Sequence, residues 1–209
     1  MGKQTAIHEQ VLITQSTQAL MELDAKWASD YDRNVNETWG YSGPDRTRYG
    51  LSKYLEPEGA RVLDAGCGTS FVGVALSSGR CRQIDGVDYS QPMLRETAKK
   101  GVYQHLERMN LNIALPIDTG VYDDVTCVGT FTSAHVVPEA LNERVRVTRT
   151  DGIVCCTVRE ESWQHTYFSE VLDRIIRAET AKLLALCEEP YVHSEHSICK
   201  MVVLQVERP

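Results

Sequence analysis

The sequence contains no long apolar run, and this absence excludes whole classes of protein. No stretch approaches the roughly 20 apolar residues that a transmembrane helix needs, and the N-terminal MGKQTAIHEQ has no apolar signal core. The Met1-Gly2 start carries Ala6 where a myristoylation signal needs serine or threonine. We therefore expect a cytoplasmic protein with no membrane partner.

Runs of basic residues are missing as well. The formal net charge is -7 at pH 7, and the lysines and arginines are scattered along the chain. Proteins that bind nucleic acid usually gather positive charge on one face. The composition therefore predicts no nucleic-acid partner and favours a small molecule or a protein as substrate, whether the chain is a monomer or a homodimer.

A paired cysteine framework is also absent. The seven cysteines are odd in number, and several lie in apolar runs that we interpret as strands, which indicates buried thiols in a reducing compartment. With 209 residues, 42% of them hydrophobic and 24% charged, the chain has an ordinary globular composition. This composition predicts one domain with one core.

From Ala60 onward, short β-rich runs alternate with helical patterns. This alternation is typical of a parallel sheet with helices on both faces, so we predict an α/β fold. Helices are predicted after Ser70, from Ser90 to Gly101, and over residues 168–176, where apolar side chains recur at helical spacing. The predicted strands are Arg61–Asp64, Gln83–Val87, His105–Met109, Tyr122–Val128, Gly152–Val158 and Ile198–Val206.

The first fifty or so residues have a different character. Apolar side chains at helical spacing between Val11 and Tyr31 precede the turn-rich segment WGYSGPDRT. We interpret residues 1–50 as an N-terminal helical lid that belongs to the same domain, and residues 51–209 as the core that binds the ligand.

The stretch RVLDAGCGTS, Arg61 to Ser70, is the main ligand-binding signal. A strand that ends in glycines and runs into a helix presents backbone N–H groups to a ligand, which the glycines allow to come close. A dinucleotide fingerprint needs a third glycine where Phe71 stands, so an NAD-dependent oxidoreductase is disfavoured. Asp88 ends the next predicted strand, where its carboxylate can accept hydrogen bonds from two ribose hydroxyls.

Together with GVDYSQPML and YDDVTCVGTFTSAHVVPEAL, the stretch VLDAGCGTS resembles the class I S-adenosylmethionine (SAM) dependent methyltransferases. Within this class, the chain is similar to the small stand-alone enzymes related to the Williams-Beuren syndrome region methyltransferase-like protein. The resemblance implies a single Rossmann-like domain whose mostly parallel seven-stranded sheet has an antiparallel last strand. It also implies methyl transfer from SAM to a small-molecule metabolite or natural-product acceptor, with S-adenosylhomocysteine as the product.

The same resemblance implies which residues hold the cofactor. Asp64 would order the turn, Asp88 would bind the ribose, and Tyr31 would close over the ligand. The full set lies at the ends of the first four strands and in the lid: Tyr31, Asp64, Gly66, Cys67, Gly68, Asp88, Tyr89, Met93, Asn110, Leu111, Gly129 and Thr130.

Ser70 and Asn110 are among the positions that depart from the family pattern, as are Thr132–His135 and Thr148–Gly152. Ser70 stands in place of the last motif glycine, so either a small side chain fits there or its hydroxyl bonds the ligand carboxylate. Asn110 stands where the family usually has an acidic residue; its amide can still accept a hydrogen bond from the adenine amino group.

The acceptor side of the site is less specified. His135 follows the fourth predicted strand and has a suitable pKa for a general base, although it can equally be a histidine that shapes the pocket. Trp39, Tyr41, Arg159 and Trp163 are the other candidates for acceptor binding.

Two further readings concern metal binding and a function without methyl transfer. His193, His196 and Cys199 recur at a spacing of three, but strand alternation sends neighbouring side chains to opposite faces, so we predict no metal site. The main alternative function is a SAM-binding protein that does not methylate, either a cyclase- or isomerase-like enzyme or a partner-binding pseudoenzyme.

Overall fold

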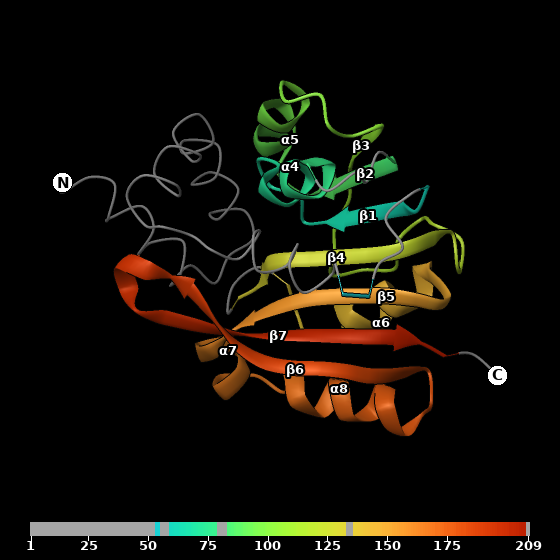
Figure 1. The fold of residues 1–209 in the computed structure, drawn as a ribbon, viewed down its shortest axis with the longest axis vertical. Helices are drawn as coiled ribbons and strands as arrows, with labels where there is room; N and C mark the ends of the chain where they lie inside the picture. The colour runs from blue at the N-terminus through green and yellow to red at the C-terminus, as the bar shows by residue number, and fades with distance from the viewer. Residues whose placement is uncertain (1–52, 55–58, 79–82, 133–135, 208–209) are drawn as a thin grey trace.

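A computed structural model describes residues 53–54, 59–78, 83–132 and 136–207 (Figure 1). The predicted lid, residues 1–50, lies outside the described residues, together with Tyr31, Trp39, Tyr41 and His135.

The centre of the fold is one seven-stranded sheet with the order β3-β2-β1-β4-β5-β7-β6. Strands β1 to β5 pair in parallel, whereas β7 runs antiparallel to both of its neighbours. This arrangement confirms the predicted mostly parallel sheet with an antiparallel last strand. The strands are β1 (Arg61–Ala65), β2 (Gln83–Asp88), β3 (His105–Arg108), β4 (Tyr122–Phe131), β5 (Thr148–Arg159), β6 (Ala181–Val192) and β7 (Ser197–Val206).

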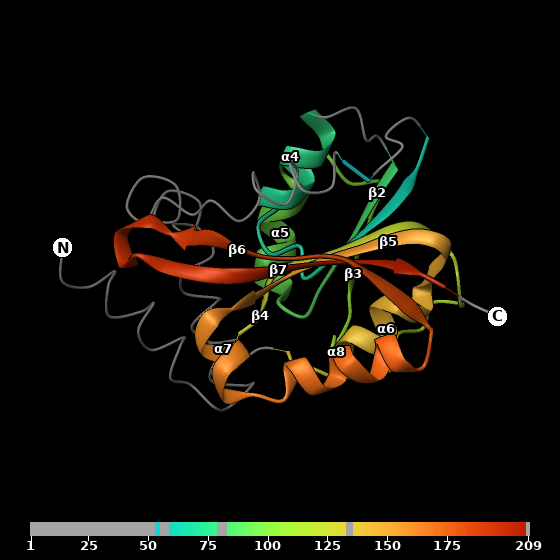
Figure 2. The same ribbon diagram turned by 60° about the horizontal axis from the view of Figure 1, so that its bottom comes forward.

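Helices cover both faces of this sheet, as predicted. Figure 2 shows α4 and α5 on one side and α6, α7 and α8 on the other. In α8, the apolar stripe is buried through Val171, Leu172 and Ile175, which explains why its spacing was readable in the sequence. The helices are α4 (Phe71–Ser78), α5 (Gln91–Ala98), α6 (Ala140–Val147), α7 (Glu160–His165) and α8 (Phe168–Arg177), with a 3-10 turn at His193–Glu195.

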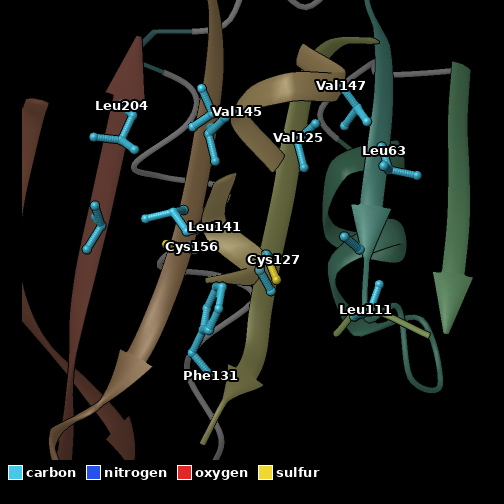
Figure 3. Close-up of a cluster of buried hydrophobic side chains, with 14 of the residues drawn as sticks. Leu63, Leu111, Val125, Cys127, Phe131, Leu141, Val145, Val147, Cys156 and Leu204 are labelled. Carbon is cyan, nitrogen blue, oxygen red and sulfur yellow. The ribbon is translucent and has the colours of Figure 1, made fainter. Parts of the chain in front are cut away.

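The larger hydrophobic core lies between the sheet and the helices α6 and α8 (Figure 3). Strand side chains such as Leu63, Val125 and Leu204 meet Leu141 and Val145 of α6 there, and all five are 6% exposed or less. Burying each such side chain contributes about 1.5 to 3 kcal/mol to folding. A smaller cluster occupies the opposite face of the sheet.

Among the strands, β6 and β5 differ most from the sequence prediction. Strand β6 is absent from the predicted set because it is a half-exposed edge strand that pairs, among the described strands, only with β7, and it carries Glu188, Glu189 and Pro190. Proline is tolerated at a sheet edge because one side of the strand makes no ladder hydrogen bonds. Strand β5 begins at Thr148, four residues before the predicted start at Gly152, and this first part is irregular, with Asp151 at φ +64°.

The topology places the ends of the parallel strands at one edge of the sheet. The arrows of β1, β4 and β5 point to the same edge in Figure 1, and α7 begins there directly after β5. Open α/β sheets bind their ligands at this carboxyl edge. Within the described ranges, none of the helices is long and apolar enough to cross a membrane.

Candidate functional site

The turn between β1 and α4 is the centre of the candidate site. Gly66 adopts φ +89°, and the N–H groups of Gly66 and Cys67 both donate to the Val87 carbonyl, at 2.7 and 3.1 Å. A Cβ atom on Gly66 would collide with the side chain of Thr130 at the end of β4. Glycine therefore suits this position, because any side chain would be strained at this dihedral angle and would collide with Thr130.

The outer side of Gly68 is open among the described residues. A Cβ atom built on Gly68 would meet none of their atoms within 4 Å. On the inner side, its N–H donates to Oδ2 of Asp88 at 2.9 Å, and its carbonyl accepts a hydrogen bond from the Thr97 hydroxyl of α5. The peptide is thus held firmly from behind and remains open in front, which fits the close approach of a ligand such as SAM.

Asp88 at the end of β2 links the turn to the start of α5. Its Oδ2 accepts the Gly68 N–H, and its Oδ1 accepts the Ser90 N–H at 2.8 Å. Burial raises the pKa of Asp88, while the backbone N–H donors lower it. Each carboxylate oxygen has a second lone pair, so Asp88 can still accept the ribose hydroxyls predicted from the sequence.

Asp64 lies beneath the turn and is fully buried. Its Oδ2 accepts a hydrogen bond from the Tyr103 hydroxyl at 2.6 Å, and its Oδ1 accepts one from the Thr126 hydroxyl at 2.9 Å. Burial raises the pKa of Asp64 to about 6, and the nearby Asp88 adds to this, while the two hydroxyl donors oppose it. Asp64 therefore joins β1 to β4 and to the segment before β3.

Tyr103 fills a space that two glycines leave free. A Cβ atom on Gly86 of β2 would stand 2.9 Å from the Tyr103 ring, and one on Gly73 of α4 would collide with it. The ring therefore sets how closely α4 approaches the sheet beside the turn. Sequence reasoning missed this residue, although the two unassigned glycines near the motif were a usable signal.

Ser70 has the backbone conformation of the glycine it replaces. Its φ is +88°, a region that favours glycine. The side chain is fully buried, and among the described residues its hydroxyl has no hydrogen-bond partner. Both sequence interpretations of Ser70, an accommodated small side chain and a hydroxyl that bonds the ligand carboxylate, stay predictions.

The ends of β3 and β4 contribute further predicted residues. Leu111 is buried, and its Cδ1 would lie 3.4 Å from a Cβ on Gly66, while Thr130 flanks the same glycine. Gly129 adopts φ +75° and donates its N–H to the Thr157 hydroxyl at 3.0 Å. The structure therefore brings the turn and the ends of β3 and β4 together.

Three predicted adenine contacts lie around α5 and β3. Met93 is buried in α5. The Arg108 guanidinium lies over the Tyr89 ring, with its Cζ 4.9 Å from the ring centre. Oδ1 of Asn110 accepts the Asn112 N–H at 3.0 Å, which fixes the amide orientation. Their contacts with adenine remain predictions.

Helix α6 holds the loop that follows β3. Arg144 donates from Nη1 to the Leu111 carbonyl at 3.2 Å, and Oε2 of Glu143 accepts the Leu115 N–H at 2.8 Å. Arg146 donates from Nη2 to the Leu115 carbonyl at 3.1 Å. Sequence reasoning missed this clamp, and the basic pattern ERVR was its only signal.

Two predicted acceptor contacts lie after β5. The Arg159 guanidinium already pairs with two carboxylates, from Nε to Glu161 at 2.7 Å and from Nη2 to Glu195 at 2.8 Å. Trp163 is half-buried and packs against Phe168, with 5.8 Å between the ring centres. In the part of the chain that the structure describes, no three potential metal ligands gather.

Comparisons with known proteins agree with this geometry. Residues 63–156 match the family described as "Methyltransferase domain". Human Methyltransferase-like protein 27 is 35% identical over 159 residues, which cover 73% of this chain and 64% of that protein. Demethylmenaquinone methyltransferase of Bacillus subtilis is 31% identical over 105 residues, 47% of this chain and 45% of that protein. The chain thus spans less than two thirds of the length of either relative.

Solved structures share the fold at low sequence identity. A chain of the complex between the Haloferax volcanii Trm112 methyltransferase activator and a methyltransferase superposes with a TM-score of 0.66 at 16% identity, covering 88% of this chain and 98% of that one. The [4+2]-cyclase SpnF superposes with a TM-score of 0.62 at 15% identity, covering 79% of this chain and 81% of that one. A SAM-dependent methyltransferase from Aquifex aeolicus superposes with a TM-score of 0.60 at 18% identity, covering 88% of this chain and 98% of that one.

Proposed function

The chain belongs to the class I SAM-dependent methyltransferases, and from this membership we propose that it transfers the methyl group of SAM to a small-molecule acceptor. The observation that carries the proposal is the turn at Gly68, which is open toward a ligand and held from behind by Asp88. The bound cofactor would supply a methyl group activated by the sulfonium. The residues of the chain would bind and orient both reactants.

The proposed roles follow from position. Asp88 would accept the ribose hydroxyls, Leu111 and Asn110 would contact adenine, and Thr130 would border the methionine part of the cofactor. Transfer is an in-line displacement that needs the acceptor lone pair close to the methyl carbon and little water, so positioning supplies most of the rate. His135 would serve as general base only for an acceptor that must first lose a proton.

The proposed activity is tested by binding and by turnover. Titration calorimetry should show S-adenosylhomocysteine binding, and Asp88→Ala should weaken it by on the order of 2 to 4 kcal/mol, because both ribose hydrogen bonds are lost. Labelled methyl should pass from SAM to members of a broad panel of small acceptors. Tighter binding of NAD than of S-adenosylhomocysteine would overturn the cofactor assignment.

SAM binding without methylation is the second candidate function, because a solved cyclase, SpnF, shares this fold. Tight S-adenosylhomocysteine binding without methylation of any panel member would favour a protein that binds SAM and does not methylate. Cytoplasmic location, and a monomeric or homodimeric state, remain predictions from the sequence.

A further inference from the structure

A buried arginine lies behind the candidate site. Arg144 of α6 is fully buried. Within the part of the chain that the structure describes, its Nε and Nη2 atoms have no hydrogen-bond partner. The acidic residue next to it, Glu143, pairs with Arg146 instead. A buried charge with unpaired donors lowers stability, so packing alone does not explain an arginine at this position.

The Nη1 group of Arg144 holds the loop that follows β3. It donates to the Leu111 carbonyl at 3.2 Å and to the Ala140 carbonyl of its own helix at 3.0 Å. Leu111 lies in a turn outside the strands of the sheet, so strand pairing does not fix its backbone. Because a buried carbonyl needs a hydrogen-bond partner, the bond from Arg144 ties this turn to α6.

The same arginine lies near Cys127 of β4. Cys127 is fully buried on the α6 side of the sheet (Figure 3), and its thiol forms a 2.8 Å hydrogen bond with the Thr130 hydroxyl. Burial raises the pKa of Cys127, while the charge of Arg144 and the Thr130 hydroxyl lower it. Arg144 is therefore a neighbour of β4 as well as of the loop after β3.

Both of these neighbours lead directly to the turn at Gly66. A Cβ atom on Gly66 would lie 3.4 Å from Cδ1 of Leu111 and would collide with the side chain of Thr130. Leu111 and Thr130 thus flank the same glycine from two different elements. Arg144 lies behind both, through its bond to Leu111 and through Cys127.

We propose that Arg144 is a positioning residue for the cofactor: it fixes Leu111, and with it Asn110, so that the loop after β3 distinguishes adenine from other purines. This inference rests on the proposed function, which places adenine at Leu111 and Asn110. Arg144 acts through the Leu111 carbonyl rather than by contact with the cofactor. An apolar side chain of similar length would fill the same space but would leave this carbonyl without its donor.

Two ligands that differ at one edge of the purine test the inference. S-inosylhomocysteine carries an oxygen where S-adenosylhomocysteine carries the adenine amino group. The wild type should bind S-adenosylhomocysteine roughly tenfold more tightly or better, because groups placed to pair with adenine do not match the altered edge. Calorimetry measures both affinities on the same protein, so their ratio does not depend on the folded fraction.

Arg144→Met removes the donor and keeps a long unbranched side chain. Its preference for S-adenosylhomocysteine should fall below about threefold, because the loop after β3 loses its link to α6. Arg144→Lys retains an N–H donor and the charge, and should keep a preference between those of the wild type and Arg144→Met. Arg149→Met is the control: Arg149 pairs with Asp123 at the opposite edge of the sheet, and its loss should leave the preference unchanged.

The outcomes separate this inference from the proposed function. An unchanged preference in Arg144→Met, an equal loss in Arg149→Met, or a loss in Arg144→Lys as complete as in Arg144→Met would overturn the inference and leave the proposed function standing. Equal binding of the two ligands by the wild type would do the same. If the wild type binds neither ligand, the proposed function fails and this inference fails with it.

Amide hydrogen exchange on the wild type tests the same point without a variant. S-adenosylhomocysteine should slow exchange in peptides that cover residues 110–115, because the ligand would lie against this loop. Unchanged exchange there would overturn the inference even if Arg144→Met did not fold.

Discussion

The Tyr103 hydroxyl donates a 2.6 Å hydrogen bond to Oδ2 of the fully buried Asp64, and so joins the segment before β3 to the end of β1. The glycine turn begins immediately after β1, so this bond lies directly beneath the proposed cofactor site. A buried carboxylate that loses a donor keeps its desolvation cost. The turn therefore depends on a side chain far from it in sequence.

Tyr103→Phe should lower the free energy of unfolding by about 1 to 3 kcal/mol, because the ring remains and only the donor to Asp64 is lost. S-adenosylhomocysteine affinity should fall as well, since the support of the turn changes. Urea unfolding and titration calorimetry measure the two effects. Tyr122→Phe is the matched control: it removes a 3.0 Å hydrogen bond to Asp85 at the opposite edge and should leave the affinity unchanged.

Ser70→Gly should raise the free energy of unfolding by about 0.5 to 1 kcal/mol, because glycine adopts φ +88° without strain. S-adenosylhomocysteine affinity should stay within about twofold, since the Ser70 hydroxyl is buried beneath the turn. Thermal unfolding and calorimetry provide the measurements. A large loss of affinity would show instead that the hydroxyl binds the cofactor.

Asp124→Asn should stabilise the protein in a pH-dependent manner. Burial raises the pKa of Asp124 from 3.8 to about 6, so between these values the folded state binds more protons than the unfolded state. The contribution of Asp124 to stability therefore falls as the pH rises through this window. The stability difference between variant and wild type should grow by about 2 to 3 kcal/mol from low pH to pH above 6, as measured by urea unfolding at each pH.

Asp123→Asn should change stability with the opposite pH dependence to Asp124→Asn. Hydrogen bonds from the Arg61 N–H and the Arg149 guanidinium lower the pKa of Asp123 against the effect of burial. Asp123 therefore stabilises the folded state at pH values above the ordinary pKa of an aspartate, and this stabilisation is lost as the pH falls. The variant should therefore be less stable than the wild type at neutral pH, and the same trend in both variants would contradict this interpretation.

His135→Ala tests the predicted general base. S-adenosylhomocysteine affinity should remain nearly intact, because a base contacts the acceptor rather than the adenosine. Turnover of a hydroxyl acceptor should fall by roughly 10²- to 10⁴-fold, and the acidic limb of the kcat/KM profile should disappear. If His135→Asn retains full activity with the same profile, the residue only shapes the pocket.

The strands that carry the turn were predictable from the sequence because they are buried on both faces. In β1, Val62 to Ala65 are fully buried, so a continuous apolar run with one acid marks the strand. Strand β6 gives no such signal, because an edge strand tolerates Glu188 and Pro190 among apolar residues. Only the pairing with β7 makes it a strand.

Contacts between distant segments could not be predicted from local patterns. Tyr103 lies 39 residues from Asp64, and although Gly73 and Gly86 indicate space for a large side chain, no local pattern identifies Tyr103 as the residue that fills it. Arg144 is fully buried in α6 although arginine usually marks an exposed face, and it binds the Leu111 carbonyl 33 residues away. The acceptor contacts of the predicted site depend on such tertiary placement and remain predictions.

The packing of Tyr103 between Gly73 and Gly86 constrains how this chain can change in evolution. A methyl group at either glycine would collide with the aromatic ring, so each substitution alone should be selected against. After Tyr103 has become smaller, a methyl group at Gly73 would fill the vacated space and should become favourable, whereas one at Gly86 would still stand 2.8 Å from Leu106 Cδ2. Gly73 and Tyr103 therefore form an epistatic pair in which the order of mutations decides whether the change at Gly73 is accessible.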